Sequence, residues 1–279
     1  MFLHGRGQSG EDLPGVRAHW AGGLARGLAA AGLPPIDARD ACFPFYGAAL
    51  TGALGSAREV VLSDAAPGAR PDAAPVRDAY TAVLEEAARA TGMPASEPAQ
   101  GSRESGPLDL VQRALSWLAG RSALDEVVIA TVFRDVAAYL TDERVRKVVL
   151  DVVLDELPPD GDLVFVAHSL GTVVAMDVLR ELPDRRVPLL VTAGSPLGLD
   201  AVHGELLSPD LRRPANVARW VNAWAVPDAV AIGCPLGDDW SGVVDVRTAN
   251  PRSGAHDIAE YLADARVAGE IGGAWGIAP

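Results

Sequence analysis

The second half of the chain alternates between short, continuously apolar runs and segments with helical periodicity. The runs of strand length are 162–168, 187–193, 217–225 and 243–247. Helices are predicted at 170–182 and 255–268, between and after these runs. A strand without polar alternation needs cover on both faces, which a parallel sheet flanked by helices provides. The pattern therefore predicts an α/β fold with a mostly parallel sheet and helices on both faces.

The run 162–168 leads directly into Ser169, and a helix is predicted from Leu170 onward. Ala167 and Gly171, two positions before and after the serine, are small enough to let the strand and the helix pass closely. A sharp turn of this kind lifts the serine Oγ above the sheet edge. It also directs the backbone N–H of Leu170 toward the same place, where it would stabilise an oxyanion. The pattern predicts a nucleophilic serine; the alternative is a serine that only caps a helix.

A nucleophilic serine requires a general base, and the chain has five histidines. His256 follows the last apolar run and opens the terminal helix. The order serine, acid, histidine along the chain favours it over the others, with an exposed loop histidine as the alternative. The remaining histidines are His4, His19, His168 and His203. We expect the side chain of His168 to point away from that of Ser169.

The acid of such a site belongs on the loop after the next-to-last strand. Asp228 stands there, just beyond the run 217–225. A carboxylate at this position can hold the imidazole tautomer of the base and stabilise its charged form. The rival carboxylates are Asp238, Asp239 and Asp245, of which Asp245 lies within the last predicted strand. We favour Asp228.

Together these motifs resemble the α/β-hydrolase superfamily of serine esterases, lipases and acyltransferases. The features that carry the resemblance are His4-Gly5, the AHSLG segment at 167–171, Ala193-Gly194-Ser195-Pro196, Pro227-Asp228 and His256. They cover about the first 45 residues and residues 160–268. The resemblance implies that the backbone N–H of Arg6 is the second oxyanion donor. It also implies an acyl-enzyme mechanism that needs neither metal nor organic cofactor.

The chain is expected to form a single domain, 1–279, with a helical insertion at 46–159 that no motif covers. Helices are predicted at 76–91 and through 108–157, with breaks near 120–121 and 141–142. Segments 63–75 and 92–107 are poor in large apolar groups and read as loops. The insertion is interpreted as a cap or as crossover helices packed on the sheet. As a cap over an acyl pocket, it would favour a hydrophobic acyl chain.

The amino-terminal region also contains two short strand candidates. Met1-Phe2-Leu3 is expected to be the end of a strand whose start lies upstream of the printed sequence, because strands are usually longer. The apolar run 41–45 predicts a second strand, which Pro44 weakens. The glycines of 4–10 match neither a P-loop nor a dinucleotide fingerprint, so a nucleotide site is not expected there.

The formal net charge of −13 argues against nucleic acid and anionic lipid as partners. Cys42 and Cys234 are expected to be free thiols, and they offer no zinc spacing. There is no apolar run of transmembrane length and no signal-peptide pattern at the start, so a cytoplasmic location is expected.

The residues predict a serine hydrolase that acts on an ester-type bond of a small acyl substrate. An acyltransferase, thioesterase or peptidase with the same three residues stays open, as does a non-catalytic hydrolase-like binding protein. The sequence leaves the acyl length and the oligomeric state open.

Overall fold

The computed structural model describes residues 1–5, 13–37, 41–54, 73–94, 107–208 and 210–277 of the chain. Over these residues there is one five-stranded sheet, all parallel, with its strands paired in sequence order. The strands are β1 (Phe2–Leu3), β2 (Val164–His168), β3 (Val187–Ala193), β4 (Val217–Trp224) and β5 (Val243–Arg247). The predicted α/β class and parallel sheet are therefore confirmed.

The two faces of the sheet enter two separate hydrophobic cores, because successive side chains of a strand point to opposite sides. In β2, Phe165 packs on one side together with Leu190 of β3. Its neighbour Val166 packs on the other side together with Val191. This arrangement accounts for β2 and β3, which are apolar at nearly every position.

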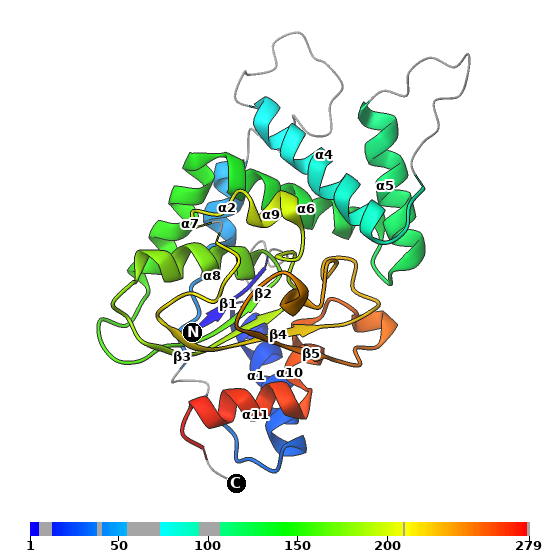
Figure 1. The fold of residues 1–279 in the computed structure, drawn as a ribbon. Coiled ribbons are helices and arrows are strands. Elements are labelled where there is room, and N and C mark those ends of the chain that lie inside the picture. Colours follow the sequence, from blue (N-terminus) through cyan, green and yellow to red (C-terminus); the bar gives the residue numbers. More distant parts are fainter. Residues whose placement is uncertain (6–12, 38–40, 55–72, 95–106, 209, 278–279) are drawn as a thin grey trace, which may run out of the picture.

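Three helices cover one face of the sheet (Figure 1). They are α1 (Leu13–Ala30), α10 (Ile258–Leu262) and α11 (Ala265–Ala274). The helix predicted at 255–268 is thus two helices. Asp257 accepts a hydrogen bond from the backbone N–H of Ala259, and Asp264 accepts one from that of Arg266. These two N-caps start separate helices within one apolar stretch.

The remaining helices lie on the opposite side of the sheet (Figure 1). They are α2 (Gly47–Leu54), α4 (Ala73–Ala90), α5 (Pro107–Arg121), α6 (Glu126–Thr141), α7 (Glu143–Asp155), α8 (Leu170–Glu181) and α9 (Asp200–His203). The breaks predicted near 120–121 and 141–142 are the ends of α5 and α6. The predicted loops 63–75 and 92–107 fall largely outside the described residues.

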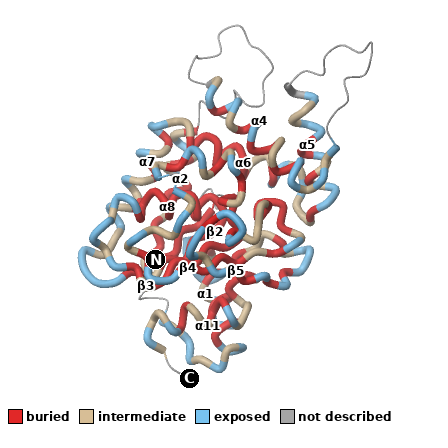
Figure 2. Tube along the Cα trace, viewed as in Figure 1, coloured by how far each residue is buried: buried red, intermediate tan, exposed pale blue. Residues whose placement is uncertain are grey.

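The helices of 46–159 share one hydrophobic core with the sheet. Leu84 of α4 and Phe133 of α6 are fully buried in the same cluster as Phe165 of β2. Figure 2 shows buried residues running from the sheet through α6 into α4, while the outer surfaces of α4 and α5 are exposed. That this region acts as a cap stays a prediction.

A buried carboxylate joins α8 to this helical layer. The hydroxyl of Tyr139 on α6 donates to Asp177 Oδ2 of α8 at 3.0 Å, and the backbone N–H of Leu207 donates to Asp177 Oδ1 at 3.0 Å. Arg146 of α7 lies 3.6 Å from Asp177 Oδ2. Burial raises the pKa of Asp177, and these donors oppose the rise. The contacts tie three helices together away from the strand ends that carry the candidate site.

The strand predicted at 41–45 is wrong, because the segment is irregular. The backbone N–H of Phe2 donates to the Cys42 carbonyl at 2.9 Å, which leaves the segment alongside β1. Pro44 has no N–H to extend the pairing. The run 41–45 is apolar because Phe43 packs against the rings of Phe2 and Trp20, and the run forms no β-ladder.

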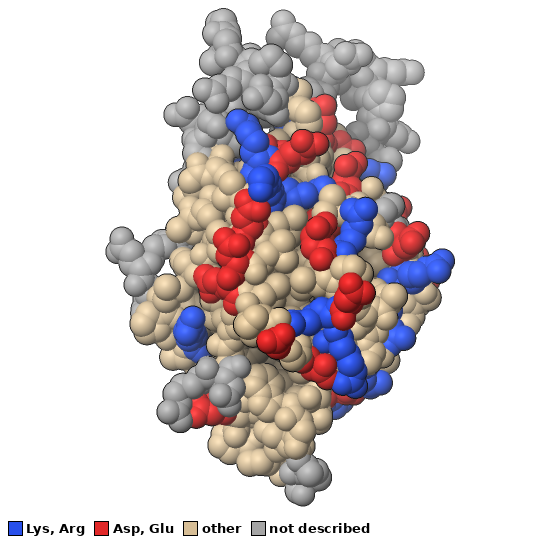
Figure 3. Space-filling view, turned by 90° about the vertical axis from the view of Figure 1, so that its left-hand side faces the viewer, with Lys and Arg blue, Asp and Glu red and all other residues tan. Residues whose placement is uncertain are grey.

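No helix in the described part of the chain is long and apolar enough to cross a membrane. On the face shown in Figure 3, acidic and basic side chains are interspersed. The net negative charge therefore does not gather into one acidic block on that face.

Candidate active site

Ser169 occupies a strained turn between β2 and α8. Its φ of 56° and ψ of −129° make it the one non-glycine residue with positive φ in the described part of the chain. Such backbone strain costs about 1–3 kcal/mol and collects at functional sites. The turn is held by the Ser169 backbone N–H, which donates to the Ala193 carbonyl at 3.1 Å, and by Thr172 Oγ1, which donates to the Ser169 carbonyl at 2.7 Å.

Two glycines beside this turn stand in tight space, and one of them is the predicted Gly171. A Cβ on Gly171 would lie 2.7 Å from the His4 carbonyl oxygen, so α8 passes directly against the end of β1. A Cβ on Gly5 would lie 2.6 Å from Ser169 Cβ and 3.1 Å from its Oγ. The His4-Gly5 segment therefore lies directly beside the candidate nucleophile.

Asp228 and His256 form a buried acid–base pair. His256 Nδ1 lies 2.8 Å from Asp228 Oδ2, and the two side chains are 11% and 0% exposed. Asp228 follows β4, where its Oδ1 accepts the backbone N–H of Val230 at 2.8 Å. The Tyr261 hydroxyl of α10 donates to Asp228 Oδ2 at 2.6 Å. These donors satisfy a carboxylate that would be costly to bury alone.

Burial distinguishes this pair from two other histidine–carboxylate pairs among the described residues. His19 Nε2 lies 2.6 Å from Asp257 Oδ1, but both side chains are at least one-third exposed. His203 Nε2 lies 2.9 Å from Asp200 Oδ1, and the Asp200 side chain is 88% exposed. Pairs of that kind contribute little, because solvent screens them.

The rival acids have other partners. Asp245 accepts hydrogen bonds from Asn222 Nδ2 at 2.8 Å and from the backbone N–H groups of Leu236 and Gly237 at 2.9 and 2.8 Å. It thus closes the turn after the Asp228 loop. Asp238 and Asp239 are exposed within that turn. Asp228 is the acid that the structure brings to His256.

The carboxyl ends of β2, β3 and β4 bring these residues to one edge of the sheet. Gly194 follows β3 with φ 55°, and a Cβ there would lie 3.0 Å from Asp228 Oδ2 and 3.1 Å from His256 Nδ1. The ring of His168, the residue before Ser169, has its centroid 4.5 Å from that of the His256 ring. The pair and the serine are therefore neighbours.

Ser169 Oγ and His256 Nε2 are both buried, and neither makes a hydrogen bond with any described residue. The structure therefore contains the hydrogen bond between His256 and Asp228, but none between Ser169 Oγ and His256 Nε2. Hydrogen bonds of this kind are often long without substrate and tighten when it binds. Two further buried nitrogens, His4 Nε2 and His168 Nε2, also have no hydrogen-bond partner in the described chain. Such atoms are rare in native proteins, and four of them gather here.

His168 is more closely involved than its place in the sequence suggests, since its ring lies against that of His256. Burial, and then the proximity of His256, lower the pKa of His168 well below its ordinary value. The imidazole is therefore neutral near pH 7. Burial also lowers the pKa of His4, whose ring stacks on Tyr46 at 4.4 Å.

Of the two residues predicted to supply oxyanion N–H groups, Leu170 lies within the described part of the chain. Leu170 is the first residue of α8, and Ser169 makes no side-chain cap, so the first N–H groups of the helix start beside the serine. Arg6 lies outside the described residues. No group of three metal-binding side chains exists in the described part of the chain. Cys42 and Cys234 are free thiols, as expected.

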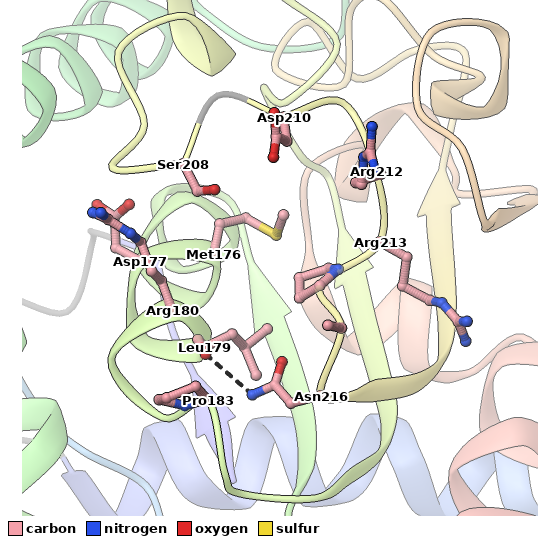
Figure 4. A pocket seen from close by; sticks show the side chains of 12 residues that line it. Met176, Asp177, Leu179, Arg180, Pro183, Ser208, Asp210, Arg212, Arg213 and Asn216 are labelled. Carbon is pink, nitrogen blue, oxygen red and sulfur yellow. Dashed lines mark hydrogen bonds between the residues drawn. The ribbon is translucent and has the colours of Figure 1, made fainter.

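A cavity of about 320 Å³ lies elsewhere, between the second half of α8 and the segment that leads into β4 (Figure 4). Met176, Arg180 and Asn216 are among its lining residues. Because Asn216 directly precedes β4, the cavity is at the amino end of that strand. The candidate site lies at the carboxyl ends of the strands, on the opposite edge of the sheet from this cavity. The carboxyl ends are where parallel sheets usually bind ligands.

No protein-family model, no curated protein and no solved structure matches this chain. The case for a function therefore depends on the residues and geometry described above.

Proposed function

We propose that the chain is a serine hydrolase of the α/β-hydrolase kind, which cleaves an ester-type acyl bond. Ser169 is the nucleophile, His256 the general base and Asp228 the acid. The observation that carries the proposal is the buried His256–Asp228 pair at the same sheet edge as a strained serine. Backbone strain of about 1–3 kcal/mol at a buried serine is typical of a functional site, and the adjacent base and acid favour catalysis over binding alone.

The mechanism follows from these positions. Ser169 Oγ attacks the acyl carbonyl carbon while its proton passes to His256 Nε2, and the carbonyl π electrons move to its oxygen. The Leu170 N–H, with that of Arg6 as the second donor, stabilises this oxyanion. The intermediate collapses, the bond to the leaving oxygen breaks, and His256 donates its proton to that oxygen. Water then attacks the acyl-enzyme by the same steps and releases the acid.

Asp228 keeps His256 in the useful tautomer. Its Oδ2 accepts the Nδ1–H at 2.8 Å, which leaves the Nε2 lone pair available for the serine proton. The buried carboxylate also stabilises the imidazolium that forms during the reaction.

The helices of 46–159 support a cap over this site. The backbone N–H of Ala123, between α5 and α6, donates to the Pro227 carbonyl at 3.2 Å, next to Asp228. Arg252, four residues before His256, donates through Nη2 to the Ser122 carbonyl at 3.2 Å. The α5–α6 connection is thus hydrogen-bonded to the loop that carries Asp228 and to the loop that carries His256. We propose that a small acyl substrate with a hydrophobic chain binds under this cover.

The test is hydrolysis of a panel of p-nitrophenyl esters and acyl thioesters of rising chain length. Ser169→Ala and His256→Ala are expected to lose at least about four orders of magnitude in kcat, because the two residues act as a unit. His203→Ala is the matched control, since it breaks a histidine–carboxylate pair outside the site. Full activity in Ser169→Ala overturns the proposal. Acyl transfer to an added acceptor without hydrolysis identifies an acyltransferase instead.

A further inference from the structure

Tyr261 touches the candidate acid at the atom that holds the base. Its hydroxyl donates to Asp228 Oδ2 at 2.6 Å, and His256 Nδ1 lies 2.8 Å from that same oxygen. The other carboxylate oxygen is occupied separately by the backbone N–H of Val230. The tyrosine is fully buried on α10, a helix that begins two residues after His256. One short segment therefore carries both donors to Oδ2.

The phenol is a donor in this contact. Burial, and then the charge of Asp228 and the hydrogen bond to it, raise the pKa of Tyr261 well above its ordinary value. The Ala225 backbone opposes this rise. The hydroxyl proton therefore stays in place, directed at Asp228, over the pH range in which a histidine base titrates.

We propose that Tyr261 is a positioning residue that fixes the Asp228 carboxylate and limits the negative charge that Oδ2 presents to His256. This inference rests on the proposed function. The Tyr261 hydroxyl and the His256 Nδ1–H both donate to Oδ2, so each of the two hydrogen bonds weakens the other. Without the phenol, the full charge of Oδ2 faces the imidazole and favours its protonated form.

Among the residues that the structure describes, two other ionisable groups contact this pair. His168 lies against the His256 ring from the end of β2. Cys234, on the loop after β4, interacts with both Asp228 and Tyr261. Burial raises the pKa of Cys234 to about 12, so it carries no charge at the pH values of the test. His168 is held neutral by its burial. Neither His168 nor Cys234 therefore accounts for a shift of the labelling midpoint in the tyrosine variant.

The test compares Tyr261→Phe with Tyr139→Phe. Both remove one buried hydroxyl from a carboxylate oxygen, and Tyr139 does so at Asp177 in the helical layer. The readout is the rate of fluorophosphonate labelling at Ser169, measured from about pH 5 to about pH 9. In Tyr261→Phe the midpoint of the acidic limb of the labelling rate moves up by about half to one pH unit. The reason is that the Asp228 carboxylate, without the hydrogen bond from the phenol, favours the protonated imidazole more strongly. Tyr139→Phe keeps the wild-type midpoint.

A second readout does not depend on activity. The Nδ1 proton of His256 gives a resonance that disappears in His256→Ala, and it moves in Tyr261→Phe while staying in place in Tyr139→Phe. An unmoved or lowered acidic midpoint in folded Tyr261→Phe overturns the role of the tyrosine while the serine hydrolase stands. An equal shift in Tyr139→Phe also overturns it. If wild-type Ser169 does not label at any pH, both this inference and the proposed function are rejected.

Discussion

Gly194→Ala tests whether the space beside the acid–base pair matters for chemistry. Gly194 has φ 55°, where an alanine costs about 1–2 kcal/mol of stability. Its Cβ would stand 3.0 Å from Asp228 Oδ2, 3.1 Å from His256 Nδ1 and 3.2 Å from His256 Cε1. All three contacts are tighter than ordinary van der Waals separation, so the pair must shift by a few tenths of an ångström.

The expected consequence is a folded protein with an impaired base. A misplacement of about 1 Å costs about 100-fold in rate, so a few tenths of an ångström should slow Ser169 labelling about 10-fold. Gly32→Ala is the matched control. Its φ of 72° carries a similar backbone cost, but its Cβ would meet nothing within 4 Å.

The assay is the second-order rate of fluorophosphonate labelling, with urea denaturation of the same samples. Both variants should lose about 1–2 kcal/mol of unfolding free energy, and only Gly194→Ala should label slowly. A wild-type labelling rate in Gly194→Ala would refute the reasoning, as would an equal loss of rate in Gly32→Ala.

Three further predictions concern stability. Ser169→Gly should abolish labelling and raise the unfolding free energy in urea by about 1 kcal/mol, because glycine relieves the positive φ; a lower value contradicts stored strain. His168 has a folded-state pKa well below its unfolded value, so its contribution to stability is complete above about pH 6.5 and is lost as the pH falls. In His168→Gln, the free energy of unfolding in urea should therefore decrease less steeply as the pH is lowered, by up to about 1.4 kcal/mol per pH unit. An unchanged pH dependence of the unfolding free energy argues against a buried neutral imidazole. Leu84→Ala should cost about 2–5 kcal/mol and shift a single unfolding transition of the whole chain, whereas a separate transition for the helical layer contradicts one shared core.

The central strands β2 and β3 were predictable because burial on both faces demands apolar side chains at nearly every position. β3 and β5 coincide with their runs in the sequence, and Asp228 was located by the end of β4. The turn at Ser169 was equally visible, since it requires small neighbours on both sides. Local chemistry sufficed for these features.

The rest depends on tertiary contact. The local sequence around His168 carries no information about the distant segment that holds His256. The contact between the His168 and His256 rings was therefore not predicted. Tyr261 gave no signal, because a buried tyrosine on an apolar helix is usually a core residue. The run 41–45 misled because its apolar side chains pack as aromatic contacts beside β1 and form no ladder.

The central claim is that Ser169 is activated by His256. The most direct measurement is fluorophosphonate labelling with mass mapping of the modified peptide, on wild type, Ser169→Ala, His256→Ala and His203→Ala. The account predicts an adduct at Ser169 that is lost in Ser169→Ala, falls sharply in His256→Ala and persists in His203→Ala. An adduct elsewhere, or undiminished labelling of Ser169 in His256→Ala, would contradict it.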